Sequence, residues 1–396
     1  MADLDWKKCT LGELGVFSKG SGVTKAEVRE SGFPCIRYGE IYTHHGTVVS
    51  AYNSFIDSAT ASTSKRIEYG DILLAGSGET KEEIGKATAY MFKDEAYAGG
   101  DIVIFRPSNS DSTFLAYLLN SQDVVSQKAS AGKGDAVVHI SAADLGKIQI
   151  DIPSLREQKA IAKALSDIDE LIQVLLLEKN KFEGIRLATL QEIFFKKQFG
   201  NANLVVENVV LGEVIKEIND GGTPNTAVTH YFGGQINWAV VDDVVDEIYS
   251  TKSTLTESGL QNSSAILWPV GTLILTTGAT IGKVGIAMVP TATKQGLCGI
   301  QFDLAKVNTK FMKYWFQMNT DLLKSLSQGS TIKEVRPPEL KKIKVELPNL
   351  SYQDQIVDVI LDFDLGIANL NSEINKYESI KQGMAHDLLT GKVRLV

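Results

Sequence analysis

The sequence predicts an α+β protein built from two similar α/β domains and two long helices that pair as a coiled coil. Three observations lead to this prediction. The second half of the 396-residue chain repeats the first, each half ends in a long amphipathic segment, and the blocks before these segments alternate short apolar runs with polar loops. A repeat of about 200 residues is far too long for a solenoid, whose units have roughly 20–50 residues. We therefore expect one unit, a mixed domain followed by a helix, that occurs twice.

The repeat is visible in several short motifs that recur about 195–200 residues later. The pairs are Leu11-Gly12-Glu13 with Leu211-Gly212-Glu213, Ile84-Gly85-Lys86 with Ile281-Gly282-Lys283, and the segment Lys147 to Leu155 with Lys342 to Leu350. These matches predict one domain over residues 1–152, followed by a helical segment over 153–199. They predict a second domain over 200–346, followed by a helical segment over 347–396.

The two helical segments are poor in proline and carry helical periodicity. Their apolar positions follow the alternating four-then-three spacing of a coiled-coil seam: Ile161, Leu165, Ile168 and Ile172 in the first, and Ile356, Ile360, Phe363 and Ile367 in the second. A stripe of this kind can instead pack on its own globular domain. Two seams of matching phase in one chain favour pairing of the helices with each other.

The intervening blocks have the pattern of small domains with antiparallel strands. Short apolar runs such as Ile72–Leu74, Ile102–Phe105 and Leu273–Leu275 are separated by loops rich in Gly, Ser, Thr and Asn. Helical spacing is present at Phe114–Leu119 and over Phe311–Gln328.

Charge and cysteine content narrow the class of protein. The net charge of −8 and the pI of about 5.3 argue against a uniformly basic DNA-binding surface. Any contact with nucleic acid must rest on local patches or on basic partners. The three cysteines, Cys9, Cys35 and Cys298, lack CxxC spacing, which is typical of reduced thiols in a cytoplasm. The sequence has neither a secretory signal pattern at its start nor an apolar run near the roughly 20 residues of a membrane span, so we expect a cytoplasmic protein.

Motifs for catalysis or metal binding fail on spacing. Six residues separate Gly78 from Gly85, where a phosphate-binding loop has four. The five histidines, including the pair His44-His45, have no metal-ligand spacing, and no metal site is expected. The single Pro337-Pro338 lacks the arrangement with which an amino-methyltransferase holds a flipped base. Together these observations favour a binding protein without catalytic residues over an enzyme.

Each block has three loops whose composition suits DNA phosphates and base edges, because hydroxyl, amide and lysine groups lie on glycine-rich backbone. The candidates in the first block are Lys19, Thr24, Lys25, Lys81, Lys86 and Lys133. Those in the second block are Thr223, Asn225, Thr277, Lys283, Ser330, Thr331, Lys333 and Arg336. Each residue alone is typical of a solvated loop; the recurrence of three loops at matching places indicates DNA binding.

The chain resembles the specificity subunit of a type I restriction–modification system over essentially its whole length. The resemblance rests on the segment Ile152 to Ile172, its weaker copy from Leu347 onward, the two Ile-Gly-Lys loops, and the ending His386-Asp-Leu-Leu-Thr-Gly-Lys392. In the second copy Ser351-Tyr352 stands where the family often has Arg-Glu, while Gln353 is retained.

This resemblance implies two target-recognition domains, each reading one half of a bipartite site in double-stranded DNA, separated by two antiparallel helices with internal pseudo-two-fold symmetry. It also implies two methyltransferase subunits, which bring S-adenosylmethionine, and optional restriction subunits. The chain itself would bind no cofactor and catalyse nothing. The alternative is a coiled-coil adaptor or decoy that binds partner subunits without reading DNA, which the net charge of −8 mildly favours.

Overall fold

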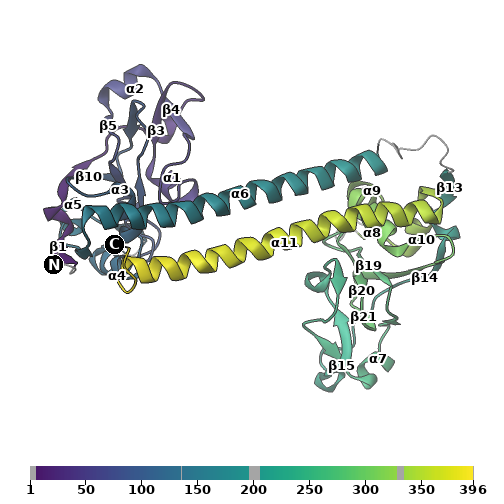
Figure 1. The fold of residues 1–396 in the computed structure, drawn as a ribbon. Helices are drawn as coiled ribbons and strands as arrows, with labels where there is room; N and C mark the ends of the chain where they lie inside the picture. Colours follow the sequence, from purple (N-terminus) through teal and green to yellow (C-terminus); the bar gives the residue numbers. More distant parts are fainter. Residues whose placement is uncertain (1–5, 135, 196–205, 328–333, 396) are drawn as a thin grey trace. The chain divides into compact units, whose positions relative to one another are not determined.

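A computed structural model describes residues 6–134, 136–195, 206–327 and 334–395. The chain forms two compact units, one from residues 1–176 together with 372–396 and the other from residues 177–371. Each unit contains one globular domain and a part of each long helix (Figure 1). The helices are thus shared between the two units.

The domain of the first unit contains two four-stranded sheets. The first has the order β2 (Gly15–Lys19), β10 (Ile102–Pro107), β6 (Ile72–Ala75) and β8 (Ala87–Ala89), and the second has β4 (Ser54–Ile56), β3 (Phe33–Ile36), β9 (Ala96–Ala98) and β5 (Lys65–Ile67). All neighbours are antiparallel except β3 and β9. The strands predicted at Ile72–Leu74 and Ile102–Phe105 are confirmed as parts of β6 and β10.

Strand β6 is apolar throughout because both of its faces are covered. Ile72 and Leu74 lie in one buried cluster, and Leu73 and Ala75 lie in another. The remaining elements of this domain are short: β1 (Lys7–Thr10) with β12 (Gln149–Ile152), β7 (Ser77–Gly78) with β11 (Val138–His139), α1 (Tyr38–Thr43), α2 (Ser58–Thr63), α3 (Ser112–Leu119), α4 (Gln122–Ala131), α5 (Ala142–Leu145), and the 3-10 turns η1 (Leu11–Glu13) and η2 (Lys25–Glu27).

The domain of the second unit repeats this plan. Its five-stranded sheet has the order β14 (Ile215–Asp220), β22 (Leu297–Phe302), β19 (Leu273–Thr276), β20 (Val284–Ala287) and β16 (Glu247–Ile248). Its four-stranded sheet has the order β17 (Thr254–Leu255), β15 (Phe232–Ala239), β21 (Thr291–Thr293) and β18 (Leu267–Trp268). The other elements are β13 (Val206–Val210) with β23 (Lys344–Pro348), α7 (Glu257–Gln261), α8 (Thr309–Met318), α9 (Thr320–Ser325), α10 (Pro337–Lys341), η3 (Leu211–Glu213), η4 (Thr229–Tyr231) and η5 (Val241–Asp243).

The segment with predicted helical spacing in this domain is helical but is interrupted once. The helical spacing over Phe311–Gln328 belongs to two helices, α8 and α9, and Gln328 lies outside the described residues. The break falls at Asn319, which ends α8 with φ −104° and ψ 25° and whose side-chain Nδ2 donates to the carbonyl oxygen of Trp315 at 2.8 Å. An asparagine competes in this way with the backbone for hydrogen bonds and favours helix ends.

The long helices α6 (Leu155–Phe194) and α11 (Leu350–Leu389) each have 40 residues and run antiparallel, as predicted. In the second unit the ring of Phe182 packs on that of Phe363 at 6.3 Å between centroids, and Leu190, further along α6, lies in one cluster with Ile356 and Ile360. In the first unit Ile161 and Leu165 share a buried cluster with Leu388 and Leu389 of α11.

These clusters also contain the cores of the two domains, so the first turns of each helix pack on their own domain and on the other helix at once. Of the other predicted seam residues, Ile168 and Ile172 are buried, and Phe363 and Ile367 are half-buried. None of the described helices combines the length and the apolar character that a membrane span requires.

Candidate nucleic-acid interface

The loop from Gly20 to Lys25 is held against two neighbouring segments of the first domain. The Ser21 N–H donates to the Ala98 carbonyl oxygen at 3.1 Å, and the Ser21 hydroxyl donates to the Thr63 carbonyl oxygen at 3.3 Å. A Cβ at Gly20 would lie 2.0 Å from the Gly99 carbonyl oxygen, so only glycine allows the loop to pack this closely. The loop presents the exposed predicted residues Thr24 and Lys25, and the exposed Lys19 ends β2 directly before it.

Val23, in the middle of this loop, has the left-handed backbone conformation, with φ 58°. This conformation is costly for a β-branched residue. Its side chain is 5% exposed and lies in a buried cluster with Cys35, Ile56 and Tyr97. Burial of this side chain offsets the cost and fixes the path of the chain between Gly22 and Thr24.

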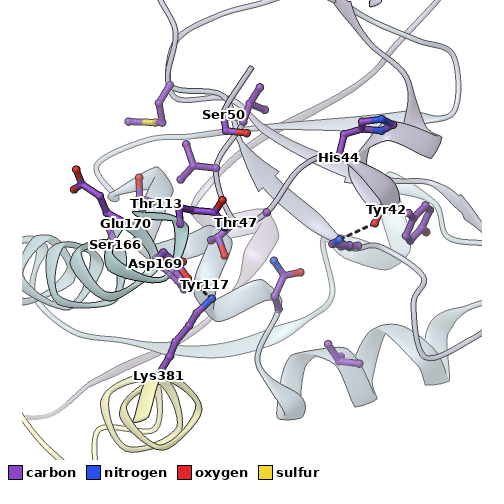
Figure 2. Close-up of a pocket in the computed structure, with 18 of the residues that line it drawn as sticks. Tyr42, His44, Thr47, Ser50, Thr113, Tyr117, Ser166, Asp169, Glu170 and Lys381 are labelled. Atoms are coloured by element: carbon purple, nitrogen blue, oxygen red, sulfur yellow. Dashed lines mark hydrogen bonds and ion pairs between the residues drawn. The ribbon is translucent and has the colours of Figure 1, made fainter. Parts of the chain in front are cut away.

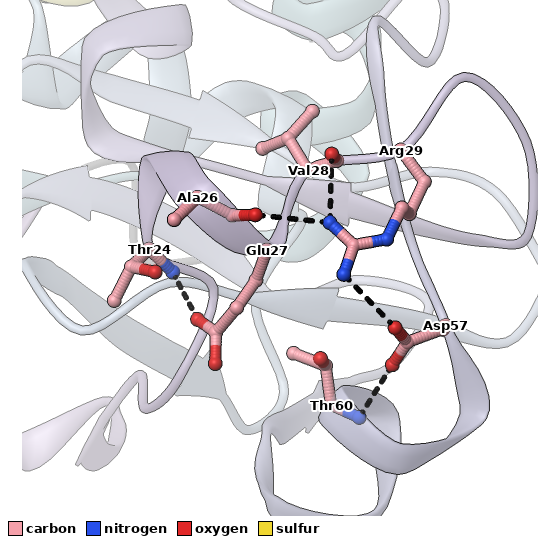
Figure 3. Close-up of polar contacts among 7 residues, drawn as sticks. All are labelled: Thr24, Ala26, Glu27, Val28, Arg29, Asp57 and Thr60. Atoms are coloured by element: carbon pink, nitrogen blue, oxygen red, sulfur yellow. Dashed lines mark hydrogen bonds and ion pairs between the residues drawn. The ribbon is translucent and has the colours of Figure 1, made fainter.

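A group of polar contacts fixes the segment that follows (Figure 3). The Glu27 carboxylate accepts from the Thr24 N–H at 2.6 Å, and this bond holds the pKa of Glu27 below its ordinary value. The Arg29 guanidinium pairs with Asp57 at 3.2 Å and also donates to two backbone carbonyl oxygens. Asp57 in turn accepts from the Thr60 N–H at the start of α2, which lowers the pKa of Asp57. Arg29 is therefore engaged within the domain.

The other predicted lysines of the first domain differ in their exposure to solvent and in their bonds to other residues. Lys81 is exposed. Lys86 is half-buried, its Nζ donates to the Tyr42 carbonyl oxygen at 3.3 Å, and burial lowers its pKa. Lys133 is exposed but forms an ion pair with Asp144 at 3.2 Å.

A pocket of about 1010 Å³ lies beside Lys86, between α1, α3, α4 and the long helices of the first unit (Figure 2). On one side Asp169 of α6 accepts from the Tyr117 hydroxyl at 2.5 Å and pairs with Lys381 of α11. Lys128 is fully buried at the pocket, where its Nζ donates to the Gly85 carbonyl oxygen at 2.6 Å. Burial lowers the pKa of Lys128 to about 7.

In the second domain the predicted residues fall into three groups. Asn225, Lys283 and Arg336 are exposed, and Thr223 is half-buried. The Asn225 side chain accepts from the Ala227 N–H at 3.0 Å and so stabilises a turn. Ser330, Thr331 and Lys333 lie outside the described residues.

Thr277 requires a correction to the set of candidates. Its side chain is buried, and its hydroxyl has no hydrogen-bond partner among the described residues. Its backbone N–H donates to the Gly296 carbonyl oxygen, and its own carbonyl oxygen accepts from the Val335 N–H. These long-range bonds turn the side chain inward, so Thr277 supports the loop and does not face solvent.

Equivalent glutamines join each long helix to its domain. The Gln158 side chain accepts from the Asp111 N–H at 2.9 Å, just before α3, and donates to the Pro153 carbonyl oxygen at 2.9 Å. Gln353 accepts from the Asn308 N–H at 2.9 Å, just before α8, and donates to the Pro348 carbonyl oxygen at 2.8 Å. Both are buried, so each helix begins at a fixed place on its domain.

The position before each glutamine differs between the halves, as Ser351-Tyr352 in the sequence implied. Glu157 accepts two bonds from the Arg394 guanidinium, at 2.7 and 2.8 Å, and a third from the Leu395 N–H. This pairing fastens the end of the chain to the start of α6 and lowers the pKa of Glu157. Tyr352 occupies the equivalent place in α11.

Two cations escaped the sequence analysis. Lys65 and Arg66 open β5 and are exposed. They follow Ser64, whose Oγ would lie 2.4 Å from a Cβ at Gly22, so they adjoin the loop Gly20–Lys25. The available signal was a basic dipeptide directly after the run Ser-Thr-Ser, but nothing in the sequence places it beside a loop 40 residues earlier.

Comparison with known proteins identifies the family. The sequence model of the family described as the type I restriction modification DNA specificity domain matches this chain twice, over residues 3–183 and 204–379. A specificity subunit of the type I restriction enzyme MjaIX from Methanocaldococcus jannaschii is 33% identical over 42% of this chain and 40% of its own length. The putative MjaX specificity subunit from the same organism is 26% identical over 83% of this chain and 80% of its own length.

Solved structures agree in fold. The S subunit of a type I restriction–modification system from M. genitalium superposes with a TM-score of 0.61 at 14% identity, over 98% of this chain and 97% of that one. A chain from a study of complex assembly and conformational transition of the type I R-M system gives a TM-score of 0.62 at 16% identity, over 98% and 99%. The chain therefore belongs to the family of type I restriction–modification specificity proteins and carries its DNA specificity domain twice.

Proposed function

We propose that this chain is the DNA-recognition subunit of a type I restriction–modification complex. Each domain reads one half of a bipartite site in double-stranded DNA, and the long helices set the gap between the halves. The observation that carries the proposal is the double match to the specificity domain, which coincides with two similarly folded domains in one chain. A duplicated reader suits a target with two separate parts.

The chemistry in this proposal belongs to partner subunits. Two methyltransferase subunits bring S-adenosylmethionine, and restriction subunits join them where present, while this chain catalyses nothing. The long helices offer apolar side chains for docking: Leu171, Val174 and Leu177 of α6 are exposed at helical spacing. A subunit that reads DNA works where the DNA lies, which places the complex in the cytoplasm.

The alternative, an adaptor that binds the partners and reads no DNA, rests on the net charge of −8. A salt series of DNA binding separates the two functions. A specificity subunit in complex with its methyltransferase should prefer its own target at moderate salt. An adaptor should show no sequence preference at any salt concentration.

Exchange of one domain gives the sharper test. Replacing residues 200–346 by the corresponding block of a relative should change one half of the methylated motif and leave the other half intact. The motif is determined by sequencing adenine methylation in cells that carry the hybrid chain and the methyltransferase. A change in both halves would show that the domains do not read independently.

A further inference from the structure

We infer, on the basis of the proposed function, that the first domain contacts the phosphates of the DNA backbone through a basic surface that the second domain lacks. The basic surface consists of Lys25, Lys65 and Arg66. The two domains would thus contribute unequally to the electrostatic part of DNA binding, although they share one fold.

The three cations lie around one contact in the first domain. Ser21 and Gly22 touch Thr63 and Ser64, through the bond from the Ser21 hydroxyl and through the close approach at Gly22. Lys65 and Arg66 follow Ser64 directly, and Lys25 follows Gly22 by three residues. Hydroxyl groups and glycine backbone therefore lie where the two chain segments that carry the positive residues meet, which is a composition suited to phosphate contacts.

All three side chains are exposed, and within the described part of the chain none has a hydrogen-bonding or ion-pairing partner. The neighbouring Arg29 is different, because Asp57 neutralises it. A free cation on a chain of net charge −8 is available to an anionic partner. DNA phosphate is the partner that fits three cations spread along a strand end and a loop.

The register of the strands shows which residues of the second domain are equivalent. In the first domain β5 pairs with β9 so that Arg66 faces Tyr97, and Ser21 donates to the next residue of β9, Ala98. In the second domain β18 pairs with β21 so that Leu267 faces Ala292, and Gly222 donates to the next residue, Thr293. Leu267 therefore stands in the place of Arg66.

The same alignment places Ile266 at the position of Lys65 and Thr226 at the position of Lys25. Leu267 is 41% exposed, so the position remains on the surface while its charge is lost. Three cations of the first domain are thus replaced by two aliphatic side chains and one hydroxyl. The difference is one of charge at matching positions and not of fold.

The experiment compares charge variants of the full chain in complex with its methyltransferase. Binding to a duplex that carries the target is measured over a series of salt concentrations. The double variant Lys65→Ala, Arg66→Ala should reduce the magnitude of the negative slope of log affinity against log salt concentration by about 1.8. Each lost phosphate contact contributes about 0.9 to this magnitude. The methylated motif should stay the same, because backbone contacts position the protein and do not read sequence.

The matched control removes two exposed lysines of the same unit, Lys7→Ala and Lys8→Ala, and should leave the slope unchanged. The reciprocal variant Ile266→Lys, Leu267→Arg should raise the slope by up to about 1.8. Equal slopes for the Lys65/Arg66 variant and the wild type, or an equal fall in the control, would overturn the inference. A complex that shows no preference for any sequence would instead overturn the proposed function.

Discussion

Arg186 of α6 donates through Nε to the Asp364 carboxylate of α11 at 2.5 Å, and the Tyr314 hydroxyl donates to the same carboxylate at 3.0 Å. The Arg186 guanidinium also lies 5.7 Å from the centre of the Tyr314 ring. The first unit has the equivalent group of Asp169, Lys381 and Tyr117. Here the aspartate lies on α6 and the basic residue on α11, which is the reverse of the arrangement in the second unit. Each unit therefore joins both long helices to its domain through one aspartate.

Loss of this aspartate-centred contact should destabilise the second unit. Arg186→Ala removes a charged hydrogen bond between side chains that are 21% and 30% exposed, at an expected cost of about 1–2 kcal/mol in the free energy of unfolding. Chemical denaturation monitored by circular dichroism measures this cost. Lys181→Ala, at an exposed position of the same helix, is the control and should change stability by less than about 0.5 kcal/mol. Equal effects of the two variants would show that the pair contributes nothing.

The two Ile-Gly-Lys loops should differ in DNA binding. Lys283 is exposed, whereas Lys86 is half-buried with its Nζ bonded to the Tyr42 carbonyl oxygen. Lys283→Ala should weaken binding to all duplexes and lower the salt slope by about 0.9, and Lys86→Ala should lower it less. Affinities for target and scrambled duplexes over a salt series give the result. Loss of discrimination at one base pair in the Lys283 variant would mean that this lysine reads sequence.

Stability should depend on pH through Lys128. Burial lowers its pKa from 10.5 to about 7, so between these values the unfolded chain holds a proton that the folded chain has lost. The contribution of this group to stability therefore rises with pH over this range, by up to about 1.4 kcal/mol per pH unit. Below about pH 7 the group is protonated in both states and the contribution is constant.

Denaturation curves at several pH values compare the wild type with Lys128→Met. The free energy of unfolding of the wild type should increase relative to that of the variant as the pH rises from about 7 to about 10. The difference at each pH cancels the contributions of the other titratable groups, and its change with pH separates the titration of Lys128 from the constant cost of the lost bond to Gly85. Parallel pH profiles for the two proteins would show that Lys128 is charged in the folded state at neutral pH.

The gap in the DNA target should follow the length of the helices. Four residues inserted after Lys181 add roughly one turn, or about 6 Å. Because Phe182 packs against Gly366, α11 needs the same insertion after Gly366 to keep the pairing. The unspecified gap should grow by one or two base pairs, each of about 3.4 Å, with both half-sites unchanged. Sequencing of adenine methylation reports the motif, and an active complex with the original gap would contradict the prediction.

Much of the architecture could be predicted because its signals repeat along the chain. The motifs that recur after about 195–200 residues predicted two related domains, and proline-poor periodic segments predicted the long helices α6 and α11. The start of each helix could also be predicted, because Gln158 and Gln353 each follow a proline by five residues. Such features depend on local sequence and on backbone periodicity.

The exposure of the candidate site residues depended on tertiary structure. Loop composition put Thr277, Lys133 and Lys283 in one class, yet the first is buried, the second is paired with Asp144 and the third is exposed. Their different surroundings come from chain segments far away in the sequence, so composition cannot separate them.

The sequence by itself determined that this protein is a duplicated unit of domain and helix, because hydrophobic periodicity and repeated motifs are properties of the local sequence. Only the tertiary structure decided that Lys65 and Arg66 adjoin the loop Gly20–Lys25 and that Ile266 and Leu267 occupy the equivalent place. The physical reason is that strand register joins residues without regard to their separation along the chain. The neighbours of a surface charge are therefore established only when the sheet forms.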